Sequence, residues 1–358
     1  TEVTAGQTLT YTLSVNVALP GPADAGPYPT VVEYSGYQPS DPGLSTPARL
    51  FNTLGYAYVG VNMRGTGCSG GSFGFFEPVQ ALDGYDAVET VAAQPWVLGR
   101  RVGMVGLSYP GIAQLYVAAA RPPSLAAITP LAVVDDFVED VFYPGGIPNR
   151  SFLEGWAGAR DAESRPGGQS WAADRIAMGD EECAANQELR LQNQDLQTAL
   201  EETPFWSDEV AAPLAPRLFV DRIEVPVFLA GTWQDEQTSS HFVTMLDRFT
   251  GTDHVYVTLA NGLHIDPMSA SVFPRLLEFL DLYVAERVPT TAGAEPEPLA
   301  AGVFGAGDVA LPADRFAGNS YDEARAWFEN EPPIQVLFEL GAAEDEPEGT
   351  PATRWSAS

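Results

Sequence analysis

The residue whose surroundings point most clearly to chemistry is a serine between two apolar segments. The run Val102-Gly-Met-Val-Gly-Leu-Ser108-Tyr-Pro-Gly111 leads from a strand pattern into a helix pattern, with Ser108 at the turn. Such a strand–turn–helix exposes a serine hydroxyl and places a helix N-terminus behind it, which stabilises developing negative charge. In the common motif G-x-S-x-G, glycine stands two positions after the serine. Here Pro110 stands there, which the first turn of a helix tolerates, and Gly111 follows. We therefore predict that Ser108 is a nucleophile.

A serine nucleophile needs a base, and the chain contains three histidines. His241 falls within a helix predicted over 237–249, and His254 stands at the start of a strand. His264 comes just after a predicted strand, and catalytic groups in open α/β sheets gather beyond the carboxyl ends of strands. It also follows the serine in the order that this class of hydrolases requires. We therefore expect His264 to be the base.

The base in turn needs a carboxylate that orients its ring. Asp235 lies in the loop after the predicted strand 225–231, which completes the order serine, acid, histidine. Glu236 is its direct neighbour and competes with it. Asp135 and Asp136 follow the preceding strand and compete as well, because some hydrolases carry the acid one strand earlier. We favour Asp235.

A glycine-rich loop raises a different possibility. The segment Gly65-Thr-Gly-Cys-Ser-Gly70 matches G-x-G-x-x-G, a pattern that binds dinucleotides when a helix opens within it. Here a further glycine- and phenylalanine-rich stretch, 71–76, separates the motif from the next predicted helix. We therefore do not expect a dinucleotide site.

The two cysteines, Cys68 and Cys183, lie far apart in the sequence. They lack C-x-x-C spacing, which argues against zinc binding and thioredoxin-like chemistry. Neither a metal nor a cofactor is expected. Two interpretations of the pair remain open, a disulfide, as in a secreted protein, or two buried free thiols.

Strand and helix patterns alternate along the chain, which predicts an α/β fold with a mostly parallel sheet and helices on both faces. Together with the serine turn, this indicates an α/β-hydrolase fold with an inserted helical cap. The predicted strands are 8–19, 29–35, 56–63, 101–106, 126–134, 225–231 and 254–260. The predicted helices of the core are 81–93, 109–120 and 274–287.

The same patterns divide the chain into an α/β-hydrolase core (1–140 and 221–290), a helical cap (141–220) and an extension (291–358). The cap carries little strand pattern and is predicted to contain a long polar helix around 172–202. In the extension, 333–340 reads as a strand. One strand cannot bury itself alone, so it is either an edge strand or the start of a further β domain that is missing.

The composition excludes several classes of partner. The chain of 358 residues has 48 acidic residues and 18 basic ones, all arginine, and a net charge of −30. Such a surface repels nucleic acid and anionic membranes, and no apolar run is long enough for a transmembrane helix. We expect no nucleic acid and no membrane as partner. The acidic composition also suits a secreted protein whose signal peptide has been removed.

Several motifs together resemble the cocaine-esterase and Xaa-Pro dipeptidyl-peptidase family of α/β hydrolases, over roughly residues 1–290. They are Gly-x-Ser108-Tyr109-x-Gly111, Arg64-Gly65-Thr66-Gly67 with Ser69-Gly70-Gly71, Gln94-Pro-Trp96 with Gly103-Met104, and Tyr143-Pro144-Gly145-Gly146. The resemblance implies cleavage of a small ester, amide or short-peptide substrate through an acyl-enzyme. It leaves open an esterase, a dipeptidyl-peptidase, or a hydrolase-fold protein that binds without catalysis.

The resemblance also implies an oxyanion hole made of one backbone N–H and one tyrosine hydroxyl. The N–H would be that of Tyr109. The family's Pro-Tyr pair appears here as Gly36-Tyr37, so the hydroxyl would be that of Tyr37. The family normally ends in a jelly-roll domain, of which only a possible first strand is present in this chain.

Overall fold

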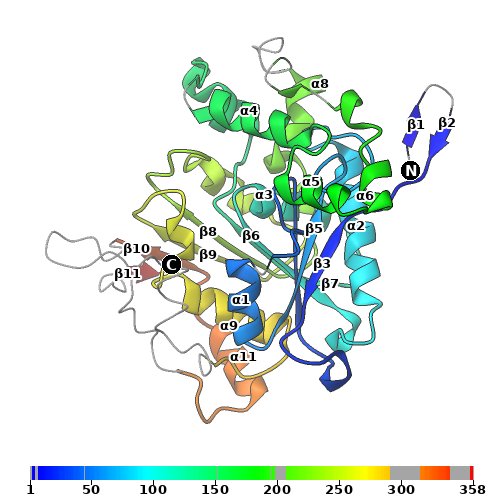
Figure 1. The fold of residues 1–358 in the computed structure, drawn as a ribbon. Helices are drawn as coiled ribbons and strands as arrows, with labels where there is room; N and C mark the ends of the chain where they lie inside the picture. Colours follow the sequence, from blue (N-terminus) through cyan, green and yellow to red (C-terminus); the bar gives the residue numbers. More distant parts are fainter. Residues whose placement is uncertain are drawn as a thin grey trace, which may run out of the picture.

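A nine-stranded sheet forms the centre of the part of the chain that the computed structural model describes (Figure 1). The described residues are 2–4, 7–43, 45–150, 152–193, 195–196, 198, 207–290, 315–338 and 355–357. The strands are β3 (Val15–Ala18), β4 (Thr30–Ser35), β5 (Ala57–Asn62), β6 (Val102–Leu107), β7 (Leu125–Leu131), β8 (Val227–Thr232), β9 (Val255–Ala260), β10 (Ile334–Leu337) and β11 (Trp355–Ala357). A separate hairpin pairs β1 (Glu2–Thr4) with β2 (Gln7–Leu9).

The order of the strands in the sheet is β11-β10-β9-β8-β7-β6-β4-β5-β3. The strands β4 to β10 are parallel to one another, and the two edge strands, β3 and β11, are antiparallel to their neighbours. The carboxyl ends of the parallel strands therefore meet at one edge of the sheet, where side chains from different loops can converge. This is the sheet that the alternating patterns predict.

Helices cover both faces of the sheet, because residues along each strand alternate between two apolar clusters. In β4, Val32 packs with α2 (Pro78–Ala92) and α3 (Tyr109–Ala119). Its neighbour Val31 belongs to the apolar cluster on the opposite face. That cluster includes residues of three other helices: α1 (Thr46–Thr53), α9 (Phe273–Tyr283) and α11 (Tyr321–Glu329). Strands with apolar residues on both faces are typical of a buried parallel sheet.

The inserted segment 141–220 forms helices at the top of the view in Figure 1. They are α4 (Phe152–Ser164), α5 (Ser170–Ala177), α6 (Glu181–Ala185) and α8 (Asp208–Ala211). Contacts of this cap reach Tyr37, which follows β4, and Cys68, which follows β5. The cap therefore lies over the carboxyl ends of the strands.

Three predicted elements differ from the structure. The long helix expected around 172–202 is broken after α5, because Gly179 adopts a φ of +96° and Asp180 caps the start of α6. The strand expected over 8–19 is two short strands, β2 and β3, separated by irregular backbone. The helix expected over 237–249 is a 3₁₀ helix, η9 (His241–Arg248).

The extension 291–358 contributes to the central sheet. β10 runs parallel to β9 and pairs on its other side with β11. The segment predicted as a strand over 333–340 therefore joins the central sheet, but the edge strand is β11 and not β10. The helix α11 was not predicted from the sequence. Its start carries a capping box, in which Ser320 accepts the N–H of Glu323 and Glu323 reaches back to Ser320. This S-x-x-E signal could have located the helix.

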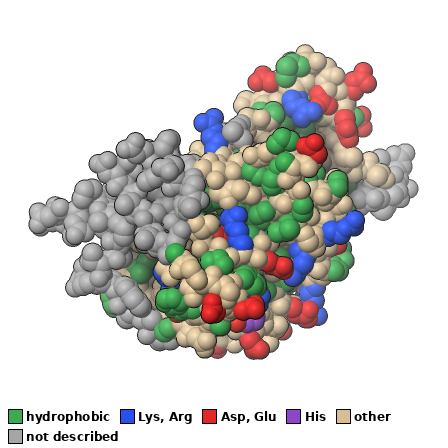
Figure 2. Space-filling model, turned by 90° about the horizontal axis from the view of Figure 1, so that it is seen from below, with side chains coloured by type: hydrophobic (Ala, Val, Ile, Leu, Met, Phe, Trp, Pro, Cys, Tyr) green, Lys and Arg blue, Asp and Glu red, His purple; other side chains and the backbone are tan. Residues whose placement is uncertain are grey.

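Charged side chains of both signs are interspersed on the face that Figure 2 shows. Among the described residues, no helix is both long enough and apolar enough to cross a lipid bilayer.

Candidate active site

Ser108 occupies a sharp turn between β6 and α3. Its φ and ψ are +68° and −126°, a left-handed conformation that is strained for a residue with a side chain. The turn is tight enough to require glycine on both sides. A Cβ on Gly106 would lie 2.5 Å from the Pro110 Cβ, and one on Gly111 would lie 2.5 Å from the Leu131 carbonyl oxygen. Gly106 and Gly111 therefore permit the tight turn that places Ser108 at the carboxyl end of β6. Ser108 is partly buried there.

A histidine and a carboxylate meet beyond the ends of β8 and β9. Nδ1 of His264 lies 2.9 Å and 3.0 Å from the two carboxylate oxygens of Asp235. Asp235 also accepts the backbone N–H groups of Gln237 and Thr238 and the hydroxyl of Thr238. Burial acts to raise the pKa of Asp235, but the hydrogen bonds from His264 and Thr238 outweigh it and lower the pKa. The carboxylate is thus held in its ionised form against the ring.

The competing acids have different partners. Glu236 accepts the backbone N–H of His264 instead of its ring. Asp136 forms an ion pair with Arg217 at 2.7 Å. Asp135 accepts the hydroxyl of Thr244, which lies in η9. Among these candidates, Asp235 is the carboxylate that contacts the imidazole of His264.

The two remaining histidines are engaged elsewhere. His241 pairs with Asp140 at 2.8 Å, and its side chain is 59% exposed. His254 lies 3.4 Å from the hydroxyls of Tyr256 and Tyr283, which belong to β9 and α9.

Tyr37 lies against Tyr109, the residue that follows Ser108 in the chain. Their rings are 5.4 Å apart and nearly perpendicular. A Cβ on Gly36 would lie 2.8 Å from the Tyr109 ring, so a larger residue at position 36 would displace that ring. Tyr109 is the first residue of α3, where backbone N–H groups have no partner within the helix. The Tyr37 hydroxyl accepts a hydrogen bond from the Trp156 indole at 3.1 Å.

A family model described as X-Pro dipeptidyl-peptidase (S15 family) matches residues 10–266. The chain belongs to this family. A CocE/NonD family hydrolase from Staphylococcus aureus has a similar structure, with 21% identity, a TM-score of 0.57, and coverage of 76% of this chain and 48% of that one. An aminopeptidase from a marine sediment archaeon superposes with 16% identity, a TM-score of 0.64, and coverage of 97% and 56%. These similarities show an α/β-hydrolase fold.

A protein of Mycobacterium bovis that is named as a serine esterase is 31% identical over 118 residues. That match covers 33% of this chain and 19% of the mycobacterial protein. The S15-family chain therefore spans less than two thirds of the length of this relative and of both similar structures.

One cavity of the S15-family chain is lined by Ser108, and a second is lined by its chain neighbour Leu107. The first is small, about 20 Å³, which is room for roughly one water. Ser108, Gln237 and Thr238 meet there among apolar, mostly aromatic side chains: Phe75, Phe76, Tyr109, Ile112, Phe137, Val141, Phe142, Phe152 and Trp156. The nucleophile candidate and the loop that holds Asp235 therefore share one uncharged cavity.

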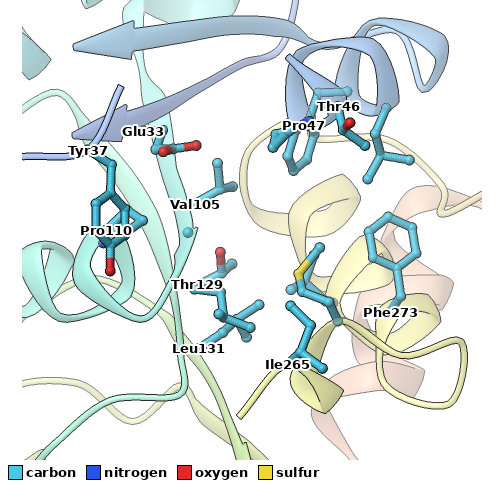
Figure 3. Close-up of a pocket in the computed structure, with 16 residues that line it drawn as sticks. Glu33, Tyr37, Thr46, Pro47, Val105, Pro110, Thr129, Leu131, Ile265 and Phe273 are labelled. Carbon is cyan, nitrogen blue, oxygen red and sulfur yellow. The ribbon is translucent and has the colours of Figure 1, made fainter. Parts of the chain in front are cut away.

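The second cavity has a volume of about 300 Å³ and is shown in Figure 3. Tyr37 and Pro110 lie on one side of it and Phe273 on the opposite side (Figure 3). Leu107 and Ile265, the chain neighbours of Ser108 and His264, also line it. Its one carboxyl side chain belongs to Glu33, which accepts the Tyr58 hydroxyl; burial raises the pKa of Glu33.

One cluster of the described residues has the composition of a metal site. Asp135, Asp140 and His241 each place a potential ligand atom within 4.8 Å of the others. The oxygens of Asp140 already contact the N–H groups of Asp135 and Asp136, the Ser239 hydroxyl and His241. Burial and the neighbouring Asp135 raise the pKa of Asp140 to about 7. The cluster thus acts as a hydrogen-bond network that ties the loop after β7 to the segment after Asp235.

Cys68 and Cys183 form a disulfide, with their Cα atoms 4.7 Å apart. The bond joins the loop after β5 to α6 of the cap, and Trp171 packs against it. The glycine-rich loop at 65–70 is held by the same part of the cap. Arg190, which is buried, donates to the carbonyl oxygens of Gly67 and Ser69. The loop therefore anchors the cap.

Sequence reasoning missed several residues of this site. Thr238 holds Asp235, and its spacing of three residues from the aspartate is a recognisable local signal. Trp156 and Arg160 contact Tyr37 from the cap. No sequence pattern could have identified them, because their role depends on how an inserted segment packs on the core.

Proposed function

We propose that this S15-family protein is a serine hydrolase that cleaves esters through an acyl-enzyme on Ser108. Ser108 Oγ attacks the carbonyl carbon, and His264 Nε2 takes its proton. The intermediate then collapses, the bond to the leaving oxygen breaks, and His264 returns the proton to that oxygen. His264 next takes a proton from a water, whose oxygen attacks the acyl carbon. The bond to Ser108 Oγ breaks, His264 returns the proton to Oγ, and the free acid leaves. The observation that supports the proposal is the hydrogen bond between His264 and Asp235, in a chain whose Ser108 occupies a strained strand-to-helix turn.

In this mechanism Asp235 keeps the proton of His264 on Nδ1, which leaves Nε2 free to act as base. The oxyanion would be bound by the N–H of Tyr109, at the N-terminus of α3, and by the hydroxyl of Tyr37. Both groups are donors, and donors aimed at developing negative charge supply a large part of catalysis. These steps use only groups of the chain itself.

The surroundings of Ser108 favour a neutral, apolar ester as substrate. The small cavity beside Ser108 is lined by uncharged side chains. The larger cavity, of a size that suits small ligands, is apolar except for Glu33 and two threonines. One apolar part of the ester would fit there, next to Leu107 and Ile265.

The family match favours a second candidate, an Xaa-Pro dipeptidyl-peptidase. Such an enzyme must hold the free amine of a peptide near the reacting carbonyl, and a buried amine needs a carboxylate partner. The uncharged lining at Ser108 argues for the ester. We also propose a secreted protein, because disulfides persist in oxidising compartments.

A direct comparison of substrates separates the two candidates. We expect p-nitrophenyl esters with short apolar acyl groups to be hydrolysed with a kcat/KM at least about 100-fold above that of Xaa-Pro anilides. Faster hydrolysis of the anilides would overturn the ester assignment while retaining the serine mechanism. Hydrolysis of neither substrate, with no labelling by a fluorophosphonate, would indicate a protein that binds without catalysis.

A further inference from the structure

One face of the cap helix α4 is directed at Tyr37. Trp156 and Arg160 stand four residues apart, so their side chains lie on the same face of the helix. The Trp156 indole N–H donates to the hydroxyl oxygen of Tyr37 at 3.1 Å. The Arg160 guanidinium lies 4.6 Å from the centre of the Tyr37 ring.

Arg160 is nine-tenths buried, yet it forms few hydrogen bonds. Its Nη2 contacts Glu163 at 2.9 Å, and the side chain is 10% exposed. Its Nε and Nη1 are buried and have no hydrogen-bond partner among the described residues. The guanidinium lies over Tyr37 and 5.8 Å from the ring of Trp156, so aromatic faces take the place of the missing acceptors. A cation in this position interacts with the ring that carries the hydroxyl.

The backbone of Tyr37 is also fixed from the cap. Its carbonyl oxygen accepts hydrogen bonds from Gln169, at 2.6 Å, and from Asn62, at 2.8 Å. Gln169 precedes α5, and Asn62 ends β5. The cap thus holds Tyr37 at its main chain, its ring and its hydroxyl.

We propose that Trp156 and Arg160 are positioning residues that orient the Tyr37 hydroxyl and strengthen it as a donor to the oxyanion. When the Tyr37 O–H donates to a substrate oxygen, electron density shifts onto the phenol oxygen. The Trp156 N–H and the Arg160 charge stabilise that density, and chains of hydrogen bonds reinforce one another. The effect grows with the charge on the substrate oxygen, so it acts mainly in the transition state. This inference rests on the proposed function and adds the cap helix to its oxyanion site.

A double-mutant cycle tests whether the two residues act through Tyr37. The variants are Arg160→Met, which keeps an apolar stem without the charge, and Trp156→Phe, which keeps an aromatic ring without the N–H. Each is made in the wild-type chain and in Tyr37→Phe. In the wild-type chain we expect each to lower kcat on a p-nitrophenyl ester about tenfold, with KM changed less than about twofold. In Tyr37→Phe, the same substitutions should change kcat less than about twofold.

The control is Arg150→Met, just before α4. Its side chain is 79% exposed and pairs only with Glu154 on the surface. This substitution should leave kcat unchanged. Thermal melting of every variant identifies those that do not fold. If Arg160→Met does not fold, the cycle of Trp156→Phe with Tyr37→Phe still tests whether the cap acts through the Tyr37 hydroxyl.

The inference is wrong if Arg160→Met or Trp156→Phe lowers kcat by the same factor with and without the Tyr37 hydroxyl. It is also wrong if neither changes kcat in the wild-type chain. These results differ from a failure of the proposed function, in which the wild-type protein itself would neither hydrolyse the esters nor react with a fluorophosphonate.

Discussion

At the scale of single residues, the proposed mechanism depends on the carboxylate that orients the ring of His264. Asp235 contacts the ring, and hydrogen bonds from His264 and Thr238 lower its pKa despite its burial. Asp135 follows the preceding strand and contacts η9 instead. The two aspartates therefore offer a matched pair of substitutions.

We predict that Asp235→Asn lowers kcat by roughly 10⁴, because an amide at this position favours the wrong tautomer of the imidazole. Asp135→Asn should change kcat by less than about tenfold. The measurement is kcat of both variants on the same ester, at a temperature well below their melting temperatures. A larger loss of kcat in Asp135→Asn than in Asp235→Asn would assign the catalytic acid to the loop after β7.

Sequence order was sufficient to choose His264 and Asp235 as a pair, and the structure brings them together at 2.9 Å. It was not sufficient for the residues that support them. Thr238 lies three residues after Asp235, which is a recognisable local signal. Trp156 and Arg160 lie in the inserted cap, and nothing in the sequence of that segment indicates that they reach the site. Their contacts with Tyr37 arise from tertiary packing, which periodicity does not report.

At the scale of elements, apolar runs identified β4 to β9 and the helices α2, α3 and α9 within a few residues. These strands are buried on both faces, so their composition is distinctive. The break between α5 and α6 was missed because the helical pattern continues through Gly179, whose positive φ ends the turn. The strand over 8–19 was predicted too long because alternation does not show where pairing ends.

The Cys68–Cys183 disulfide joins the cap to the core, so its removal should destabilise the protein. The disulfide closes a separation of 115 residues, and the chain-entropy model then gives a stabilisation of about 4 to 5 kcal/mol. We predict that Cys68→Ala with Cys183→Ala lowers the free energy of unfolding by up to this amount. Denaturant titration of both proteins measures the difference.

Alkylation of the unreduced wild-type protein under denaturing conditions provides the control for that comparison. We expect no modified cysteine in protein exposed to air. Two alkylated cysteines per chain would contradict the disulfide, and the double substitution would then report only the loss of two buried side chains.

At the scale of the whole molecule, acidic side chains outnumber basic ones. The chain has 48 acidic residues and 18 arginines. Arg64, Arg190 and Arg275 are among the buried residues, each with at most 7% of its surface exposed. Among the described residues, six aspartates are buried as well: Asp83, Asp135, Asp136, Asp140, Asp235 and Asp281. Burial therefore removes charges of both signs from the outer surface, and the acidic excess of the composition remains there. Such a surface disfavours polyanionic partners.

The sequence predicted the whole-molecule architecture well, because a parallel sheet requires a regular alternation of strands and helices. Within 291–358 it predicted a strand over 333–340 but no other element, because the rest of that segment shows little periodicity. The place of β10 between β9 and β11 depends on pairing between distant segments. The part of the extension outside the described residues stays without an assignment.

The central claim is that Ser108 forms the acyl-enzyme, and covalent labelling tests it most directly. Wild-type protein, Ser108→Ala and the remote control Ser320→Ala are treated with a fluorophosphonate, digested and examined by peptide mass spectrometry. We predict one adduct, on the peptide that contains Ser108, in wild type and in Ser320→Ala, and none in Ser108→Ala. Ester hydrolysis by Ser108→Ala should fall by several orders of magnitude. An adduct on another residue, or a Ser108→Ala variant that keeps more than about a hundredth of the wild-type rate, would contradict the account.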